Sequence, residues 1–160
     1  MRITLIAVGK LKAGPERDLA ARYIDRLAKS GPPLGFEFRR VVELPESRAS
    51  SSQARKADEA DAILKAVPSD GALLALDERG ETPDSERFAD DLAAMRDGAK
   101  RDLAIVIGGA DGLDDTVRQR ADRVISFGRL TWPHQIVRIL LAEQLYRAIT
   151  ILSGHPYHRS

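Results

Sequence analysis

Apolar runs alternate with helical patterns from the first residues of the chain to the last. Short apolar or alternating runs predict strands at residues 2–8, 36–44, 72–76, 103–107 and 123–127. Apolar positions at helical spacing predict helices at about residues 15–30, 50–67, 82–98, 114–121 and 133–153. This alternation is typical of an α/β domain with a mainly parallel sheet. Runs 72–76 and 103–107 are apolar on both faces, as central parallel strands are.

Turn and cap residues set the expected ends of several elements. Gly31 and two prolines follow the first helix and end it. Thr82 and Pro83 are expected to begin the third helix, with Thr82 as the N-cap and Pro83 at the first helical position. Residues 45–53 are the segment most typical of a mobile loop, and an ordinary surface connection explains them at least as well as a lid.

Composition places the chain among soluble globular proteins. Its 160 residues are expected to form one domain over 1–160, with 43% hydrophobic and 31% charged residues. The absence of cysteine excludes disulfides, thiolate metal sites and a cysteine nucleophile, and it fits a cytoplasmic protein. The N-terminal apolar run is too short for a secretion signal, and charged residues interrupt 136–152, so neither a signal nor a membrane span is expected.

Net charge bears on the kind of partner. Many nucleic-acid-binding proteins are strongly basic, whereas the formal net charge here is only +1. Bulk charge therefore gives no support for RNA binding, and any RNA surface on this chain is expected to be a local patch.

Polar and glycine-rich segments follow three of the predicted strands. They are 76–80 (LDERG), 107–112 (IGGADG) and 127–133 (FGRLTWP). Because ligands of open parallel sheets bind beyond the carboxyl ends of the strands, these segments form the candidate site. Glycines at 108, 109 and 112 permit a close approach between backbone and ligand, although a tight strand-to-helix turn explains them equally well. The dinucleotide fingerprint G-x-G-x-x-G and the phosphate loop are both absent.

The loop 127–132 mixes glycine, arginine, threonine and tryptophan just before the last helix. Its backbone groups suit a polar nucleoside, and Leu130 or Trp132 suits packing on a base. Taken alone, the loop is more simply interpreted as a helix entry with Trp132 filling the core.

The last predicted helix is apolar on more than one face, at Ile136, Val137, Ile139, Leu140, Leu141, Leu145, Ile149, Ile151 and Leu152. A helix that is apolar nearly all round is buried on two sides. One side is expected to cover the sheet and the other to need a partner chain, so a homodimer is predicted. Glu143 and Arg147 stand at i,i+4, for which a simple helix ion pair is the ordinary interpretation.

The tail after Gly154 contains two of the three histidines of the chain. His155 and His158 have the spacing of a metal-binding pair, but no third ligand is evident, so no metal is expected. The last residues of a chain are usually frayed, yet Tyr157, His158 and Arg159 also suit an RNA base and a phosphate.

Several segments together are similar to one known family. VIGGADG, ISFGRLTWPHQIVRILLAEQLYRA and the terminal HPYHR closely resemble the large-subunit ribosomal RNA methyltransferase H family, the pseudouridine-N3 methyltransferases of the SPOUT superfamily. The opening ITLIAVGKLK is also similar to that family. The resemblance covers essentially the whole chain and is strongest over 103–159, while 45–70 shows no specific match.

The resemblance implies a fold and a cofactor. It implies that the C-terminal part is tucked through a loop as a trefoil knot, which no spacing or periodicity predicts. It also implies that the three strand-end segments bind S-adenosyl-L-methionine, with the cofactor-binding residues Leu76, Gly108, Phe127, Gly128, Arg129, Leu130, Thr131 and Trp132.

The resemblance further implies the partners of the protein. It implies a homodimer with the active site near the dimer interface, and a substrate that is a modified uridine of large-subunit (23S) ribosomal RNA. Methylation is expected late, on the assembled ribosome, in the cytoplasm. The ribosome would supply a shaped partner, which accounts for the near-neutral charge.

Individual roles in the chemistry remain open at the level of sequence. The pyrimidine N3 must lose a proton, which His155 or His158 is suited to accept, while Tyr157 is suited to stack on a base. Stabilisation of the developing oxyanion, or contact with a phosphate, suits Arg138, Arg147 or Arg159. A nucleotide-binding oxidoreductase and a non-catalytic ribosome-associated factor are the alternatives. The missing fingerprint argues against the first, and the intact loop and tail segments argue against the second.

Overall fold

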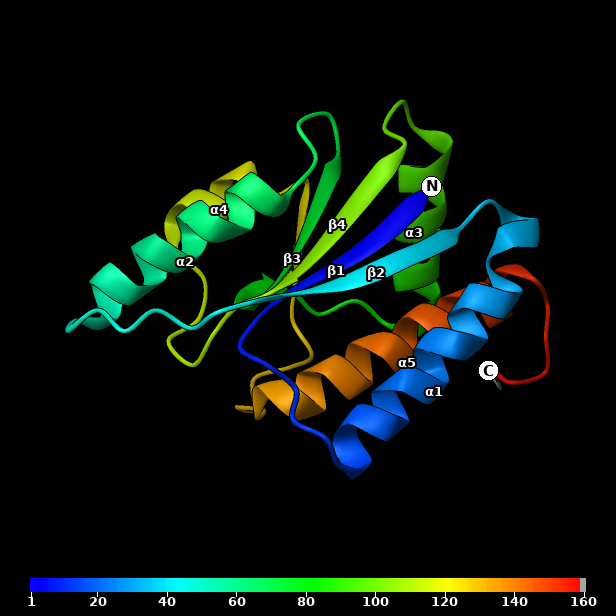
Figure 1. Cartoon of the computed structure of the whole chain (residues 1–160). Helices are drawn as coiled ribbons and strands as arrows, with labels where there is room; N and C mark the ends of the chain where they lie inside the picture. The colour runs from blue at the N-terminus through cyan, green and yellow to red at the C-terminus, as the bar shows by residue number, and fades with distance from the viewer. Residues whose placement is uncertain (159–160) are drawn as a thin grey trace.

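Five parallel strands form the sheet at the centre of the protein, in the order β2-β1-β4-β3-β5. The computed structural model describes residues 1–158. The strands are β1 (Arg2–Val8), β2 (Glu37–Leu44), β3 (Ala72–Glu81), β4 (Asp102–Ile107) and β5 (Arg123–Ile125). The mainly parallel α/β domain expected from the sequence is therefore confirmed, with β1, β4 and β3 in the interior of the sheet (Figure 1).

Helices cover both faces of the sheet. On one face lie α1 (Pro15–Ser30), α3 (Ser85–Asp97) and α5 (His134–Leu152), and on the other lie α2 (Ser52–Ala66) and α4 (Asp115–Arg120) (Figure 1). A short 3-10 helix, Pro32–Leu34, follows α1. Because side chains alternate along a strand, β1 contributes Ile3 and Leu5 to one core and Ile6 and Val8 to the other. These two cores explain why the central strands are apolar on both faces.

The third helix begins later than the sequence predicts. Asp84 is its N-cap, and its carboxylate accepts a hydrogen bond from the backbone N–H of Arg87 at 2.7 Å. The expectation that Thr82 and Pro83 begin this helix is wrong. The reason is that β3 continues to Glu81, so residues 82–84 are needed to leave the sheet and turn.

The carboxyl end of β3 wraps closely around β5. Ile125 pairs with Leu76 and again with Glu81, so residues 77–80 bow out between the two points of pairing. The backbone N–H of Ser126 donates to the carbonyl of Glu81 at 2.7 Å. A Cβ at Gly80 would lie 2.5 Å from the backbone of Ile125, so only glycine permits this approach.

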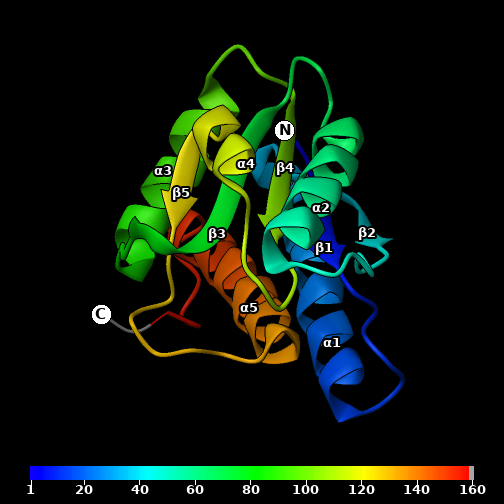
Figure 2. The same cartoon turned by 90° about the vertical axis from the view of Figure 1, so that its left-hand side faces the viewer.

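The chain then crosses the sheet from its edge to α5. β5 is the edge strand beside β3, whereas His134, the first residue of α5, lies against Gly9 at the end of β1. Figure 2 shows the connecting segment passing below the carboxyl ends of the strands. The carboxyl ends of β3 and β4 are thereby covered by residues 126–133, which form part of the candidate site.

The second apolar side of α5 has neighbours within the same chain. α5 packs extensively against both α1 and α3, and Gln135 is its one exposed residue. α1 and α3 therefore supply much of the cover that was expected from a partner chain, while Ile136, Ile139 and Leu140 stay partly accessible, and the homodimer stays a prediction. None of the helices within residues 1–158 is both long and apolar enough to cross a membrane.

Candidate functional site

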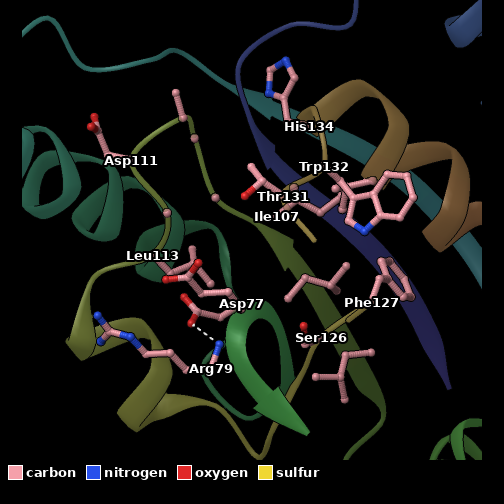
Figure 3. Close-up of a pocket in the computed structure, with 18 of the residues that line it drawn as sticks. Asp77, Arg79, Ile107, Asp111, Leu113, Ser126, Phe127, Thr131, Trp132 and His134 are labelled. Atoms are coloured by element: carbon pink, nitrogen blue, oxygen red, sulfur yellow. Dashed lines mark hydrogen bonds between the residues drawn. The ribbon is translucent and has the colours of Figure 1, made fainter. Parts of the chain in front are cut away.

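A pocket of about 290 Å³ lies at the carboxyl ends of β3, β4 and β5 (Figure 3). Three segments that are distant in sequence form its walls, namely 76–79, 107–113 and 125–132. All the residues that the resemblance assigns to a cofactor line this one pocket: Leu76, Gly108, Phe127, Gly128, Arg129, Leu130, Thr131 and Trp132. The parallel sheet brings them together because it places the carboxyl ends of its strands at one edge.

The glycine-rich loop after β4 is a tight turn that faces the pocket. The N–H of Gly112 donates to the carbonyl of Gly109 at 3.0 Å, and Gly112 has a φ of 81°. A Cβ at Gly108 would lie 3.0 Å from the backbone of Gly112 and 3.0 Å from the side chain of Leu113. A side chain at position 108 would therefore displace the loop as well as narrow the pocket.

A buried ion pair fixes one wall of the pocket. Asp77, at the end of the straight part of β3, pairs with Arg118 of α4 at 2.9 Å, and their side chains are 5% and 14% exposed. Arg118 also donates to the carbonyl of Leu113 and pairs with Asp115. It thus links β3 to the end of the glycine-rich loop. The sequence carried no signal for this role of Arg118, because a charged residue on a short polar helix is usually solvated.

The loop 126–132 forms the opposite wall and remains open to solvent. The hydroxyl of Ser126 donates to the carbonyl of Gly128 at 3.0 Å, and the N–H of Gly128 donates back to it. Gly128 has a φ of 104°, which favours glycine. Leu130 is 74% exposed and Trp132 is 41% exposed. The interpretation of Trp132 as a core residue is therefore wrong, and both side chains lie at the rim of the pocket.

The tail follows the last turn of α5 and then turns back along the helix, so that Tyr157 reaches Glu143 and His158 reaches Glu86 of α3. The pocket includes His134 at the start of α5 and none of His155, Tyr157 and His158. His155 and Tyr157 are joined by a hydrogen bond of 3.1 Å from the tyrosine N–H to Nδ1 of His155. Arg159 lies outside the described residues. Within one chain the described tail residues therefore do not form part of the pocket wall.

The tail is docked on α5 and α3 rather than frayed. The Tyr157 hydroxyl donates to Glu143 at 3.0 Å, and its ring packs on Tyr146 and beneath the Arg147 guanidinium, each at 4.9 Å. His158 Nε2 lies 2.9 Å from Glu86 of α3. Burial, and then the hydrogen bonds with Tyr23 and Glu143, raise the pKa of Tyr157, so its hydroxyl stays protonated at neutral pH.

Arg138 occupies a buried position between α5 and the first two strands. It is 6% exposed, pairs with Glu43 of β2 and donates to the carbonyl of Gly9. Glu43 also accepts from the N–H of Leu11 at 2.7 Å. Arg138 does not line the pocket. Its contacts are those of a residue that holds the end of β1 against α5, and they give no support for a role in the chemistry.

The pocket suits a small molecule with both polar and apolar parts. Leu76, Ile107 and Ile125 supply an apolar floor, while the backbone of two glycine-containing loops supplies donors and acceptors. Lys56 and Arg129 also line the pocket, and neither forms an ion pair with any residue from 1 to 158. Over the same range there is no group of three or more His, Asp or Glu side chains placed to hold a metal ion.

Solved structures share the fold at low sequence identity. A probable methylase family protein from Haemophilus influenzae aligns with 99% of this chain and 70% of its own, with a TM-score of 0.54 and 15% identity. TrmJ from Z. mobilis aligns with 91% of this chain and 69% of its own, with a TM-score of 0.51 and 18% identity. At these identities the likeness concerns the fold.

Sequence relatives are much closer. Proteins named "Ribosomal RNA large subunit methyltransferase H" are 62% identical in Allorhizobium ampelinum and 61% identical in Rhizobium meliloti, and in both cases 100% of each chain is covered. The family model described as "Predicted SPOUT methyltransferase" matches residues 1–158. Because the match extends from β1 through the pocket segments to the docked tail, this chain belongs to the SPOUT methyltransferase family.

Proposed function

We propose that this protein transfers a methyl group from S-adenosyl-L-methionine to N3 of a pseudouridine in large-subunit (23S) ribosomal RNA, on the assembled ribosome. The observation that carries the proposal is that one pocket collects every residue assigned to the cofactor, in a chain of a methyltransferase family. Relatives that share its full length and are named for large-subunit ribosomal RNA support the substrate class.

The residues of the pocket fit the proposed cofactor. Leu76, Ile107 and Phe127 offer apolar surface for an adenine ring, and the backbone at 108–112 and 126–131 offers hydrogen bonds to polar groups around it. The open rim at Leu130 and Trp132 leaves one side of the pocket accessible to a second substrate. When bound, S-adenosyl-L-methionine supplies a methyl group on a positively charged sulfur, and the protein supplies position.

The acceptor side of the reaction requires a group that takes a proton from the pyrimidine N3. Among residues 1–158 the pocket contains His134 and the tail offers His155 and His158, and we assign this purpose to the tail. Because none of His155, Tyr157 and His158 lines the pocket of its own chain, we assign the tail to the pocket of a second copy. Tyr157 and Arg147 would then lie beside the base, where a ring and a cation can stack on it or stabilise its oxygen.

A homodimer follows from this assignment and has support on the surface. An apolar cavity of about 530 Å³ opens beside the pocket rim, lined by Pro83, Phe88, Ile125, Phe127, Trp132 and Leu140 among others. Phe88 and Ile125 are buried, but Trp132 at the cavity and Leu130 near it are 41% and 74% exposed, and exposed apolar side chains that lie together commonly mark an interface. The cavity adjoins α3 and α5, which also carry the contacts of the tail. A partner seated there would bring its own tail toward the pocket.

Sedimentation of the purified protein is expected to show a dimer at micromolar concentration. The expected mass is twice the 17.6 kDa of the chain. Leu140→Arg places a charge in the apolar cavity and is expected to shift the protein toward the monomer, since an unpaired buried charge opposes association. A wild-type protein that sediments at the mass of a single chain would contradict the assignment of the tail to a second copy.

The proposed setting of the reaction is the cytoplasm, where ribosomes are assembled. Arg129 and Lys56 at the pocket are placed to contact RNA phosphates, and they form a local basic site in a chain with a net charge of +1. A small basic site is sufficient when the shape of the ribosome supplies most of the recognition.

The proposal is tested by incubating the protein with radiolabelled S-adenosyl-L-methionine and four acceptors: assembled ribosomes, large subunits, small subunits and protein-free large-subunit RNA. Label is expected in the RNA of assembled ribosomes, with much less in small subunits and protein-free RNA. If no acceptor takes up label although the cofactor binds, the protein is a binding factor and not a methyltransferase of ribosomal RNA.

A further inference from the structure

The segment between β2 and α2 is held in place rather than free. The backbone N–H of Ser47 donates to Glu59 of α2 at 3.0 Å, and the Ser47 hydroxyl donates to Asp58 at 2.7 Å. Arg55 donates to the carbonyl of Ala49 at 3.1 Å. Three side chains from the first two turns of α2 therefore hold this loop, for which the sequence left both a surface connection and a lid open. Two of these side chains, Arg55 and Glu59, also contact a neighbouring loop.

That neighbour is the glycine-rich loop of the pocket. Arg55 makes two hydrogen bonds to the Asp111 carboxylate, from Nε at 2.7 Å and from Nη2 at 3.1 Å. The same guanidinium thus joins the loop after β2 to the loop after β4. In Figure 3, Asp111 lies at the outer edge of the pocket loop, on the side away from Phe127 and Trp132. Arg55 therefore binds the loop on the side of Asp111 and does not line the pocket.

Glu59 supports the same loop one turn further along α2. Its side chain is buried, at 7% exposure, and a Cβ at Gly109 would lie 2.8 Å from its Oε2. The carboxylate is therefore in contact with the backbone of the pocket loop. Burial, Asp111 and Glu46 raise the pKa of Glu59, while Arg55 opposes that rise. Arg55 is thus the cation that lets the Glu59 and Asp111 carboxylates lie close together.

Stability alone does not explain the Arg55–Asp111 pair. The two side chains are 30% and 27% exposed, and ion pairs this accessible to water contribute little to the free energy of unfolding. Their geometry, by contrast, is bidentate and fixes an angle as well as a distance. The pocket loop contains three glycines, and Arg118 anchors it only at its end, through the carbonyl of Leu113, so the position of residues 108–112 depends strongly on contacts such as this pair.

We propose that Arg55 is a positioning residue for the cofactor pocket: through Asp111 it sets the place of the loop 108–113. The three residues Arg55, Glu59 and Asp111 form what is here named the α2 clamp. The inference rests on the proposed function, because the pocket is taken to bind S-adenosyl-L-methionine. Of the three clamp residues, Asp111 lines the pocket, whereas Arg55 and Glu59 do not. The clamp acts by holding the backbone of Gly108 and Gly109 where the cofactor meets it.

The first test compares Arg55→Gln with wild type by calorimetry with S-adenosyl-L-methionine. We expect the dissociation constant to rise by roughly tenfold, the size typical of coupling between neighbouring groups. KM for the cofactor should rise in parallel while kcat changes little. Arg55→Lys keeps the charge but loses the bidentate geometry, and an intermediate affinity is expected. Lys65→Gln, a change of charge at an exposed position on the same helix, is the matched control and should bind as wild type does.

The second test needs no cofactor. Hydrogen–deuterium exchange of the unliganded protein should be faster over 108–113 in Arg55→Gln and in Asp111→Asn, and unchanged in β1 and β4. If both variants show wild-type hydrogen exchange over 108–113 and wild-type affinity for S-adenosyl-L-methionine, the proposed role of the clamp is overturned. The same holds if exchange rises throughout the fold, which would show a general loss of stability. A wild-type protein that binds no S-adenosyl-L-methionine would overturn the proposed function instead, and the exchange data would still decide whether the clamp holds the loop.

Discussion

A chain that ends at Gly154 is expected to bind S-adenosyl-L-methionine normally and to lose methyl transfer to ribosomes by at least about a hundredfold, the lower range for a lost acid–base group. The truncation removes His155, Tyr157 and His158, which are the proposed acceptor-side groups. The pocket residues all precede Gly154, so cofactor affinity should be unchanged. Calorimetry with the cofactor and label transfer to ribosomes measure the two effects separately.

The truncation is expected to lower the free energy of unfolding slightly, because the docked tail contacts α5. Loss of the Tyr157 contact with Tyr146 is expected to lower the free energy of unfolding by about 1 kcal/mol. Glu143 keeps its hydrogen bonds from Arg147 and Gln144, so no buried carboxylate is left without a partner. Thermal melting should therefore show a folded protein. Methyl transfer at the normal rate by the truncated chain would show that the tail has only a structural role.

Mixed dimers test whether the tail that serves a pocket comes from the same chain or from the partner chain. A truncated chain combined with a full-length chain that carries a disabled pocket, Gly108→Val, should regain activity at one site per dimer. The expectation follows from the assignment of the tail to the pocket of a second copy, since none of its described residues lines the pocket of its own chain. An inactive mixed dimer, together with active full-length homodimers, would place the tail and the pocket of one chain in the same site.

Gly108→Val is expected to abolish measurable binding of S-adenosyl-L-methionine, a loss of about a hundredfold or more in affinity, because steric conflict with a ligand discriminates strongly. A Cβ at this position already lies 3.0 Å from the backbone of Gly112, and the two methyl groups of valine extend further toward the pocket and the loop. Gly108→Ala should show a smaller loss. Calorimetry across the two variants gives the graded series.

The control for this series is a glycine that lies outside the pocket. Gly98→Ala at the end of α3 is a suitable choice, because its φ of −75° suits any residue. It should bind the cofactor as wild type does. Gly108→Val itself is expected to cost about 1–3 kcal/mol through overpacking, so circular dichroism must first establish that the variant is folded. Unchanged affinity in a folded Gly108→Val protein would remove Gly108 from the proposed site.

The sequence predicts the order of the elements well, since strong periodicity in strands and helices is local information. It does not predict that β3 continues from Asp77 to Glu81. These residues are mostly polar, and Glu81 belongs to the strand only because it pairs with Ile125, which lies far along the chain. The helix cap at Asp84 is missed for the same reason. Family membership implies the C-terminal trefoil knot, and threading of this kind leaves no periodic signal in a sequence.

Some residues of the candidate site can likewise be predicted from sequence and others cannot. Residues at strand ends, such as Leu76 and Gly108, are found from sequence because the parallel sheet fixes where strand ends meet. Arg118 and Arg55 are missed because both lie on polar helices and gain their roles only from partners across the fold, Asp77 and Asp111. Arg138 is a candidate for chemistry on sequence because it lies within an apolar helix. In the structure its partners are Glu43 and the carbonyl of Gly9, and its part in the reaction stays a prediction.

The most direct test of the proposed function is the identity of the methylated nucleoside. Ribosomes from cells that lack the enzyme are incubated with the protein and isotopically labelled S-adenosyl-L-methionine, and the large-subunit RNA is digested and separated by mass spectrometry. The account predicts label in a single nucleoside, N3-methylpseudouridine, and its absence when Gly108→Val replaces the wild-type protein. Label on a ribose, on a different base or in small-subunit RNA would contradict it.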